Sequence, residues 1–67
     1  MTNLLWDRWE VFTHKGQNYG VKTKGDVGYV WQGRRGMELI QKFDGSWKPV
    51  HLTSRIALVN AAIAKLG

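Results

Sequence analysis

Cysteine is absent from this 67-residue chain, proline occurs once, and no apolar run approaches the ~18 residues needed to span a bilayer. The lack of cysteine excludes disulfides and thiolate metal sites, and it is typical of an intracellular protein. Residues 1–9 contain no basic leader followed by a long apolar run, so no signal peptide is expected. We therefore predict a cytoplasmic protein without a membrane partner.

Acidic residues are also scarce. Five Asp and Glu face ten Lys and Arg, which gives a formal net charge of +5. Such an excess favours acidic partners, with nucleic acid first, anionic protein second and anionic lipid third. The alternative interpretation is that the positive charge serves only solubility.

Patterns of catalytic or metal-binding residues are missing as well. His14 and His51 lie far apart in the sequence, and neither forms a zinc-ligand spacing with an aspartate. Ser46 and Ser54 lie in no nucleophile motif, and so small a chain has little room for a pocket. We predict no catalytic residue, no metal, no cofactor and therefore no enzyme. A small hydrolase is the least favoured alternative.

Aromatic residues, by contrast, are plentiful, with four Trp, two Tyr and two Phe. The core of a domain this small contributes only on the order of 3–5 kcal/mol. Without disulfides or thiolate metal sites, the remaining stabilisers are dense aromatic packing and self-association. We expect a single domain over residues 1–67 and, from self-association, a homodimer.

The segment 53–66 contains no glycine and predicts a helix over about residues 54–66. Thr53 or Ser54 is a suitable N-cap residue. Leu58 and Ala62 widen the apolar face, so the helix is expected to cover a sheet, to meet a second chain, or both. Large apolar residues fall three, four and three positions apart, on one face of such a helix: Ile56, Val59, Ile63 and Leu66.

Residues 8–52 predict strands that follow one another as a meander. Glycines divide this segment at roughly even spacing, and apolar residues alternate with polar ones between them. Asp44–Gly45 is a favoured two-residue hairpin turn. The last strand, 46–52, is expected at a sheet edge because Pro49 cannot donate to a ladder. The predicted fold is α+β, a four- or five-stranded antiparallel meander sheet followed by one C-terminal helix packed on one face.

Alternation also predicts which side chains face the helix. Trp9 and Trp31 follow the apolar alternation of their strands and are expected in the core. The opposite face would then be basic and lightly covered, with Lys22 and Lys24 on it. Lysines on an exposed strand that only prevent aggregation are the alternative. The residues of the two middle strands expected to face the helix are Tyr19, Val21, Tyr29 and Trp31.

Trp47 is out of step with the apolar Val50 and Leu52 and is expected on the exposed side, near Lys48. An exposed tryptophan beside cations suits stacking on a base, and it equally suits a protein interface.

The loop Gly33–Arg34–Arg35–Gly36 is the most suggestive local feature. Two arginines flanked by glycines at a loop tip can reach phosphates and bind them in a forked geometry. A basic hairpin turn whose glycines supply only geometry is the alternative. The loop is not a P-loop, because the spacing and the Lys-Ser/Thr end are missing.

The predicted element order is similar to that of several small nucleic-acid-binding domains, and also to that of small barrel modules that bind proteins. Our leading hypothesis is a small basic non-enzymatic domain that binds the phosphate backbone of nucleic acid, DNA rather than RNA, with strandedness open. It would act as a regulator or accessory protein. The residues expected at the interface are Arg34, Arg35, Lys22, Lys24, Lys42, Lys48 and Trp47.

The alternative hypothesis is a protein-interaction module or a homo-oligomeric subunit. It would use an N-terminal patch of Leu4, Leu5 and Trp6 together with the apolar helix face. Whether residues 3–8 begin a short helix stays open.

Overall fold

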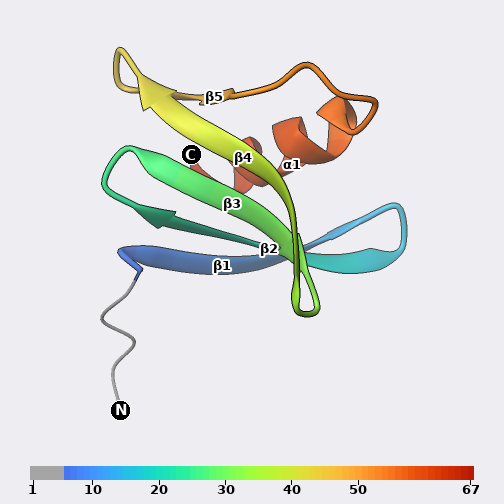
Figure 1. Cartoon of the computed structure of the whole chain (residues 1–67). Helices are drawn as coiled ribbons and strands as arrows, with labels where there is room; N and C mark the ends of the chain where they lie inside the picture. The colour runs from blue at the N-terminus through green and yellow to red at the C-terminus, as the bar shows by residue number, and fades with distance from the viewer. Residues whose placement is uncertain (1–5) are drawn as a thin grey trace.

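The computed structural model describes residues 6–67, which form five strands followed by one helix (Figure 1). The sheet is antiparallel throughout, with the strand order β1-β2-β3-β4-β5, so the predicted meander is confirmed. The elements are β1 (Arg8–His14), β2 (Gln17–Lys24), β3 (Val27–Gln32), β4 (Arg35–Phe43), β5 (Ser46–Pro49) and α1 (Ile56–Leu66).

Each strand is joined to the next by a two-residue turn, at residues 15–16, 25–26, 33–34 and 44–45. In the predicted turn, Asp44 and Gly45 have φ values of 52° and 78°, the signs that a type I′ turn requires. In the β3–β4 turn only Gly33 has a positive φ, at 60°, as in a type II′ turn. Because a two-residue turn fixes the register, these turns also decide which side chains share a face.

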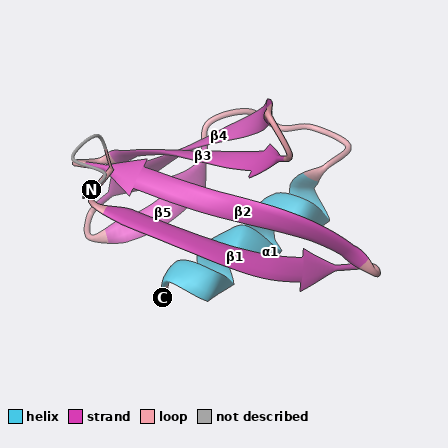
Figure 2. Ribbon diagram, turned by 90° about the horizontal axis from the view of Figure 1, so that it is seen from below, coloured by secondary structure: helices cyan, strands magenta, loops and turns pink. Residues whose placement is uncertain are grey.

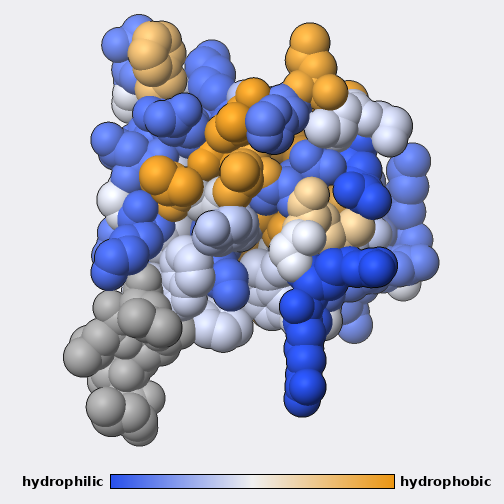
Figure 3. All heavy atoms as spheres, in the orientation of Figure 1, coloured by the Kyte–Doolittle hydropathy of each residue, from blue (hydrophilic) through white to orange (hydrophobic). Residues whose placement is uncertain are grey.

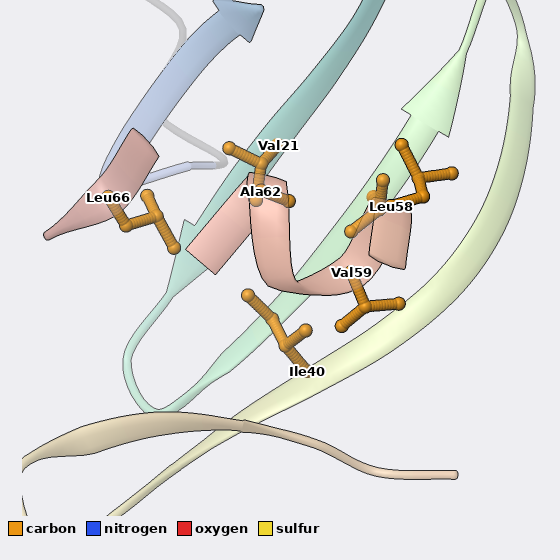
Figure 4. Close-up of a cluster of buried hydrophobic side chains, with 7 residues drawn as sticks. Val21, Ile40, Leu58, Val59, Ala62 and Leu66 are labelled. Carbon is orange, nitrogen blue, oxygen red and sulfur yellow. The ribbon is translucent and has the colours of Figure 1, made fainter. Parts of the chain in front are cut away.

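The helix lies across one face of the curled sheet, where it contacts β1, β2 and β5 (Figure 2). We call this face the helix side and the opposite one the outer face. Branched side chains of the sheet interlock with the buried side of the helix (Figure 4). The buried core consists of Val21, Val30, Ile40, Leu58, Val59, Ala62 and Leu66.

The start and the buried face of the helix differ from the prediction. The helix begins at Ile56 with Arg55 in the N-cap position, and no side chain makes a cap hydrogen bond. Thr53 Oγ1 accepts the backbone N–H of Arg55 at 2.9 Å, so it orders the preceding turn instead. Leu58 and Ala62 are central to the buried face, while Ile56 at its edge stays 36% exposed.

The predicted facing of β3 is wrong. The turn at 25–26 pairs Val21 with Val30 and Lys22 with Tyr29. Directly paired residues share a face, so Val30 enters the core, and Tyr29 and Trp31 lie on the outer face. Trp9 pairs with Lys22 and is likewise on the outer face, 50% exposed.

The prediction for the last strand is partly wrong. β5 is an edge strand as expected, but it ends at Pro49 and does not reach residue 52. The turn at 44–45 pairs Lys42 with Trp47 and Ile40 with Pro49. Trp47 is therefore on the helix side, half-buried against the core, and not on the exposed side beside Lys48.

Candidate nucleic-acid interface

A cluster of aromatic side chains surrounds Lys22 on the outer face. The Lys22 Nζ lies 4.6, 5.3 and 5.6 Å from the ring centroids of Trp6, Trp9 and Trp31. An ammonium over an aromatic face is attracted by the ring quadrupole, so the rings hold this lysine in the middle of the face. We call Trp6, Trp9, Lys22, Tyr29 and Trp31 the aromatic cluster.

The rings of the aromatic cluster form two edge-to-face pairs. Trp6 and Tyr29 have centroids 5.7 Å apart at an interplanar angle of 84°. Trp9 and Trp31 have centroids 5.6 Å apart at 85°. Edge-to-face pairs are a favoured aromatic geometry, and each contributes about 0.5–1.5 kcal/mol beyond the area it buries. The cluster is thus ordered without being covered by the helix.

Trp31 lies directly on Gly20, its partner on β2. A Cβ at position 20 would come within 2.3 Å of the Trp31 ring, so only glycine allows this ring to lie so close to the sheet. Within residues 6–67, Trp31 Nε1 is the one buried side-chain nitrogen or oxygen without a hydrogen-bond partner. Packing on Gly20 and Trp9, and not a hydrogen bond, therefore holds the ring in place.

Three surface hollows adjoin one another around these rings. The first, of about 250 Å³, lies between the aromatic cluster and the β3–β4 turn, where Trp6, Lys22, Tyr29, Trp31 and residues 33–36 line it. A second, of about 290 Å³, shares Tyr29 with the first. A third, of about 410 Å³, shares Trp31. Tyr29 and Trp31 thus each line both the first hollow and one of its neighbours.

Arg34 and Arg35 lie at the rim of the first hollow. Both are exposed, and among residues 6–67 neither forms an ion pair. Figure 3 shows strongly hydrophilic side chains projecting at the tip where Figure 1 places the β3–β4 turn. Of the predicted interface residues, the structure brings together Lys22, Arg34 and Arg35.

The carboxylates of the described chain lie away from this hollow. The two glutamates are on the helix side, where Glu10 pairs with Arg8 at 3.1 Å and Glu38 with Arg55 at 3.2 Å. The three aspartates occur just before β1 and in the β2–β3 and β4–β5 turns, which share one end of the sheet. The β1–β2 and β3–β4 turns share the other end, which carries Lys15, Arg34 and Arg35.

The other predicted interface residues are dispersed. Lys24 lies on the outer face at the far end of β2, and Lys48 lies on the outer face of the edge strand β5. Lys42 and Trp47 are on the helix side, with the Lys42 Nζ 5.5 Å from the Trp47 ring. These two residues lie next to the β4–β5 turn, at the other end of the sheet from the Arg34–Arg35 turn.

Sequence reasoning missed Trp9, Tyr29 and Trp31 as outer-face residues, because their alternation resembles that of core residues. The signals that identify their positions are the two-residue turns at 15–16, which pairs Trp9 with Lys22, and at 25–26. The turn at 25–26 makes position 21 pair with 30, and therefore puts 29 and 31 on the same face as Lys22. Of the predicted N-terminal patch, Leu4 and Leu5 lie outside the described residues, while Trp6 belongs to the aromatic cluster.

Within residues 6–67, no three His, Asp or Glu side chains form a group that could hold a metal ion. The helix in this part of the chain has neither the length nor the apolar character of a membrane span. No family, curated protein or solved structure matches this chain.

Proposed function

We propose that this chain is a small, basic, non-enzymatic nucleic-acid-binding domain whose interface is the outer face of the sheet. Lys22 and the Arg34–Arg35 turn bind the phosphate backbone, and Lys24 extends the contact along β2. DNA is the first candidate partner. The contact is to the backbone, so affinity depends little on sequence.

The observation that carries this proposal is the first hollow, in which aromatic rings and Lys22 of the outer face meet the two unpaired arginines of the β3–β4 turn. Nucleic acid presents phosphates and flat rings together, and this pairing of cations with aromatic faces is complementary to both. The position of every strand glutamate on the helix side supports the same proposal, since within residues 6–67 the strands carry no carboxylate on the outer face.

Fluorescence anisotropy with labelled DNA and RNA oligonucleotides, in single- and double-stranded form, tests the proposal. Binding should weaken steeply between low and physiological salt. The double variant Arg34→Ala/Arg35→Ala should lower affinity, and it should reduce the slope of log K against log salt by about 1.4 for a single strand. Lys42→Ala removes a lysine from the helix side and should leave the affinity and the salt slope nearly unchanged.

Two outcomes would count against the proposal. If no oligonucleotide binds even at low salt, the domain is not a nucleic-acid binder. If Lys42→Ala weakens binding as much as the arginine variant, the outer face is not the interface.

A protein-contact function is a second candidate, because the segment that joins β5 to α1 has apolar side chains on its surface. Val50, Leu52 and Ile56 are 42%, 96% and 36% exposed there. We propose that this surface, and not the buried helix face, forms the contact if the chain is a homodimer. Light scattering of the wild-type chain and of Leu52→Asp measures the oligomeric state of each. If the wild-type chain is a monomer at all concentrations, the homodimer is excluded.

A further inference from the structure

The outer face offers more than charge, because its hollows are bounded by aromatic rings. Tyr29 and Trp31 lie two positions apart on β3, which places them about 6.6 Å apart along the strand. Tyr29 is 39% exposed, so part of this side chain is accessible on the surface. Phosphate binding alone makes no use of such rings.

We infer that the ligand of this face is an unpaired, single-stranded nucleic acid, one base of which sits in the first hollow between Trp6, Tyr29 and Trp31. This inference rests on the proposed function and adds to it the strandedness of the ligand and the position of a base. The phosphates flanking that base lie toward Lys22 on one side and the Arg34–Arg35 turn on the other.

The size and the lining of the hollow favour a base. Its volume of about 250 Å³ is below the ~300–1,000 Å³ typical of sites for drug-sized ligands, so it suits one small ring system. Three of the eight residues that line it are aromatic, Lys22 lies among these rings, and Arg34 and Arg35 add cations from the β3–β4 turn. Aromatic faces with cations next to them match a base with phosphates beside it.

A duplex does not fit this surface in the same way. In a double helix the faces of each base are covered by the neighbouring pairs, so they are not available to Tyr29 or Trp31. Only a strand whose bases are unstacked can use the aromatic rings. Sequence tolerance follows from this, because every base has a face that stacks.

Anisotropy titrations of the full chain with three labelled probes of one length test the inference. The probes are a single-stranded oligonucleotide, an abasic strand with the same number of phosphates, and the duplex. The single strand should bind on the order of tenfold more tightly than the abasic strand at the same salt concentration. It should also bind more tightly than the duplex.

Two leucine variants locate the base. Trp6→Leu and Tyr29→Leu keep an apolar side chain and remove a ring, and they should bring single-strand affinity down toward that of the abasic strand, whose affinity stays the same. Phe43→Leu is the matched control, because Phe43 is 67% exposed but does not line the hollow. Circular dichroism establishes that each variant is folded.

The possible results separate the two proposals. Equal, salt-dependent binding of the single strand and the abasic strand would overturn the stacked base while leaving the phosphate interface intact. Duplex binding as tight as single-strand binding would also overturn it. No binding of any probe would overturn both.

Discussion

At Gly20 the outer face has no Cβ, and the Trp31 ring fills the space where one would lie. We predict that Gly20→Ala pushes the ring off the sheet and destabilises the fold by about 1–3 kcal/mol, the usual cost of overpacking. Tryptophan emission should change as the ring leaves its packing against Trp9. Chemical denaturation followed by fluorescence measures both effects.

Gly36→Ala is the control for that change. A Cβ at Gly36 meets nothing within 4 Å, although this residue lies opposite Trp31 on β4. Its emission spectrum should match that of the wild type. If both substitutions change the emission alike, the close approach of Trp31 to Gly20 is not what positions the ring.

The two ion pairs on the helix side differ in how far they are exposed. The side chain of Glu38 is 7% exposed where it pairs with Arg55, whereas the Arg8–Glu10 pair is 46% and 35% exposed. We predict that Arg55→Ala costs about 1–3 kcal/mol, because it leaves a buried carboxylate without its partner. Glu10→Ala should cost between about 0 and 1 kcal/mol, as exposed pairs do.

Urea denaturation of the two variants compares these costs. High salt should reduce the effect of Glu10→Ala more than that of Arg55→Ala, because buried pairs are screened less. Equal losses of stability at low salt would mean that Glu38 is rehydrated when Arg55 is removed.

At the level of the elements, the helix is held by its buried face and not by a side-chain cap of its first turn. Leu58 is 6% exposed, and no side chain caps the first turn. We predict that Leu58→Ala costs about 2–5 kcal/mol, which is comparable with the whole stability expected of a domain this small. Thermal melting followed by circular dichroism should show a largely unfolded chain.

Ile56→Ala is the matched control, because Ile56 belongs to the same helix but lies at the edge of its apolar face, 36% exposed. Its melting temperature should change far less. A larger loss of stability from Ile56→Ala than from Leu58→Ala would mean that Ile56, as predicted from the sequence, lies at the centre of the buried face.

Element boundaries were largely predictable because local chemistry determines them. Glycines and the Asp44–Gly45 pair mark the turns, and the glycine-free segment forms the helix. The end of β5 was not predictable from alternation, because the strand stops at Pro49 although the apolar residues Val50 and Leu52 follow.

The facing of the strands was harder to predict, because it depends on pairing across a turn. In β3 the aromatic residues have the alternation of core residues, yet Val30 is the one that pairs with the buried Val21. The register outweighs the hydrophobicity of the side chains here. The arginine turn was identified from the sequence because local residues determine a turn. Trp9 and Trp31 were assigned to the core because their facing depends on pairing across a turn.

For the whole molecule, the end of the sheet that carries Lys15, Arg34 and Arg35 and no aspartate should steer the ligand. We predict that Lys15→Glu, at the basic end, slows association with an oligonucleotide several-fold at low salt and much less at high salt. Stopped-flow fluorescence measures the association rate. The dissociation rate should hardly change, because Lys15 does not line the first hollow.

Lys65→Glu makes the same change in net charge on the last turn of α1, across the sheet from the outer face. It should slow association less than Lys15→Glu does. Equal effects of the two substitutions would show that net charge, and not its position, governs the encounter.

A sheet in which every strand pairs with its neighbour in sequence closes through short loops, and short loops lose little chain entropy. The four hairpins can therefore form one after another on the microsecond timescale typical of hairpins. Only the helix must pack against a strand that is distant in sequence. Its last residue reaches β1, where Arg8 Nη1 donates to the backbone oxygen of Leu66 at 2.6 Å. We expect helix docking to be the late step of folding, so the outer face can take shape before the hydrophobic core is sealed.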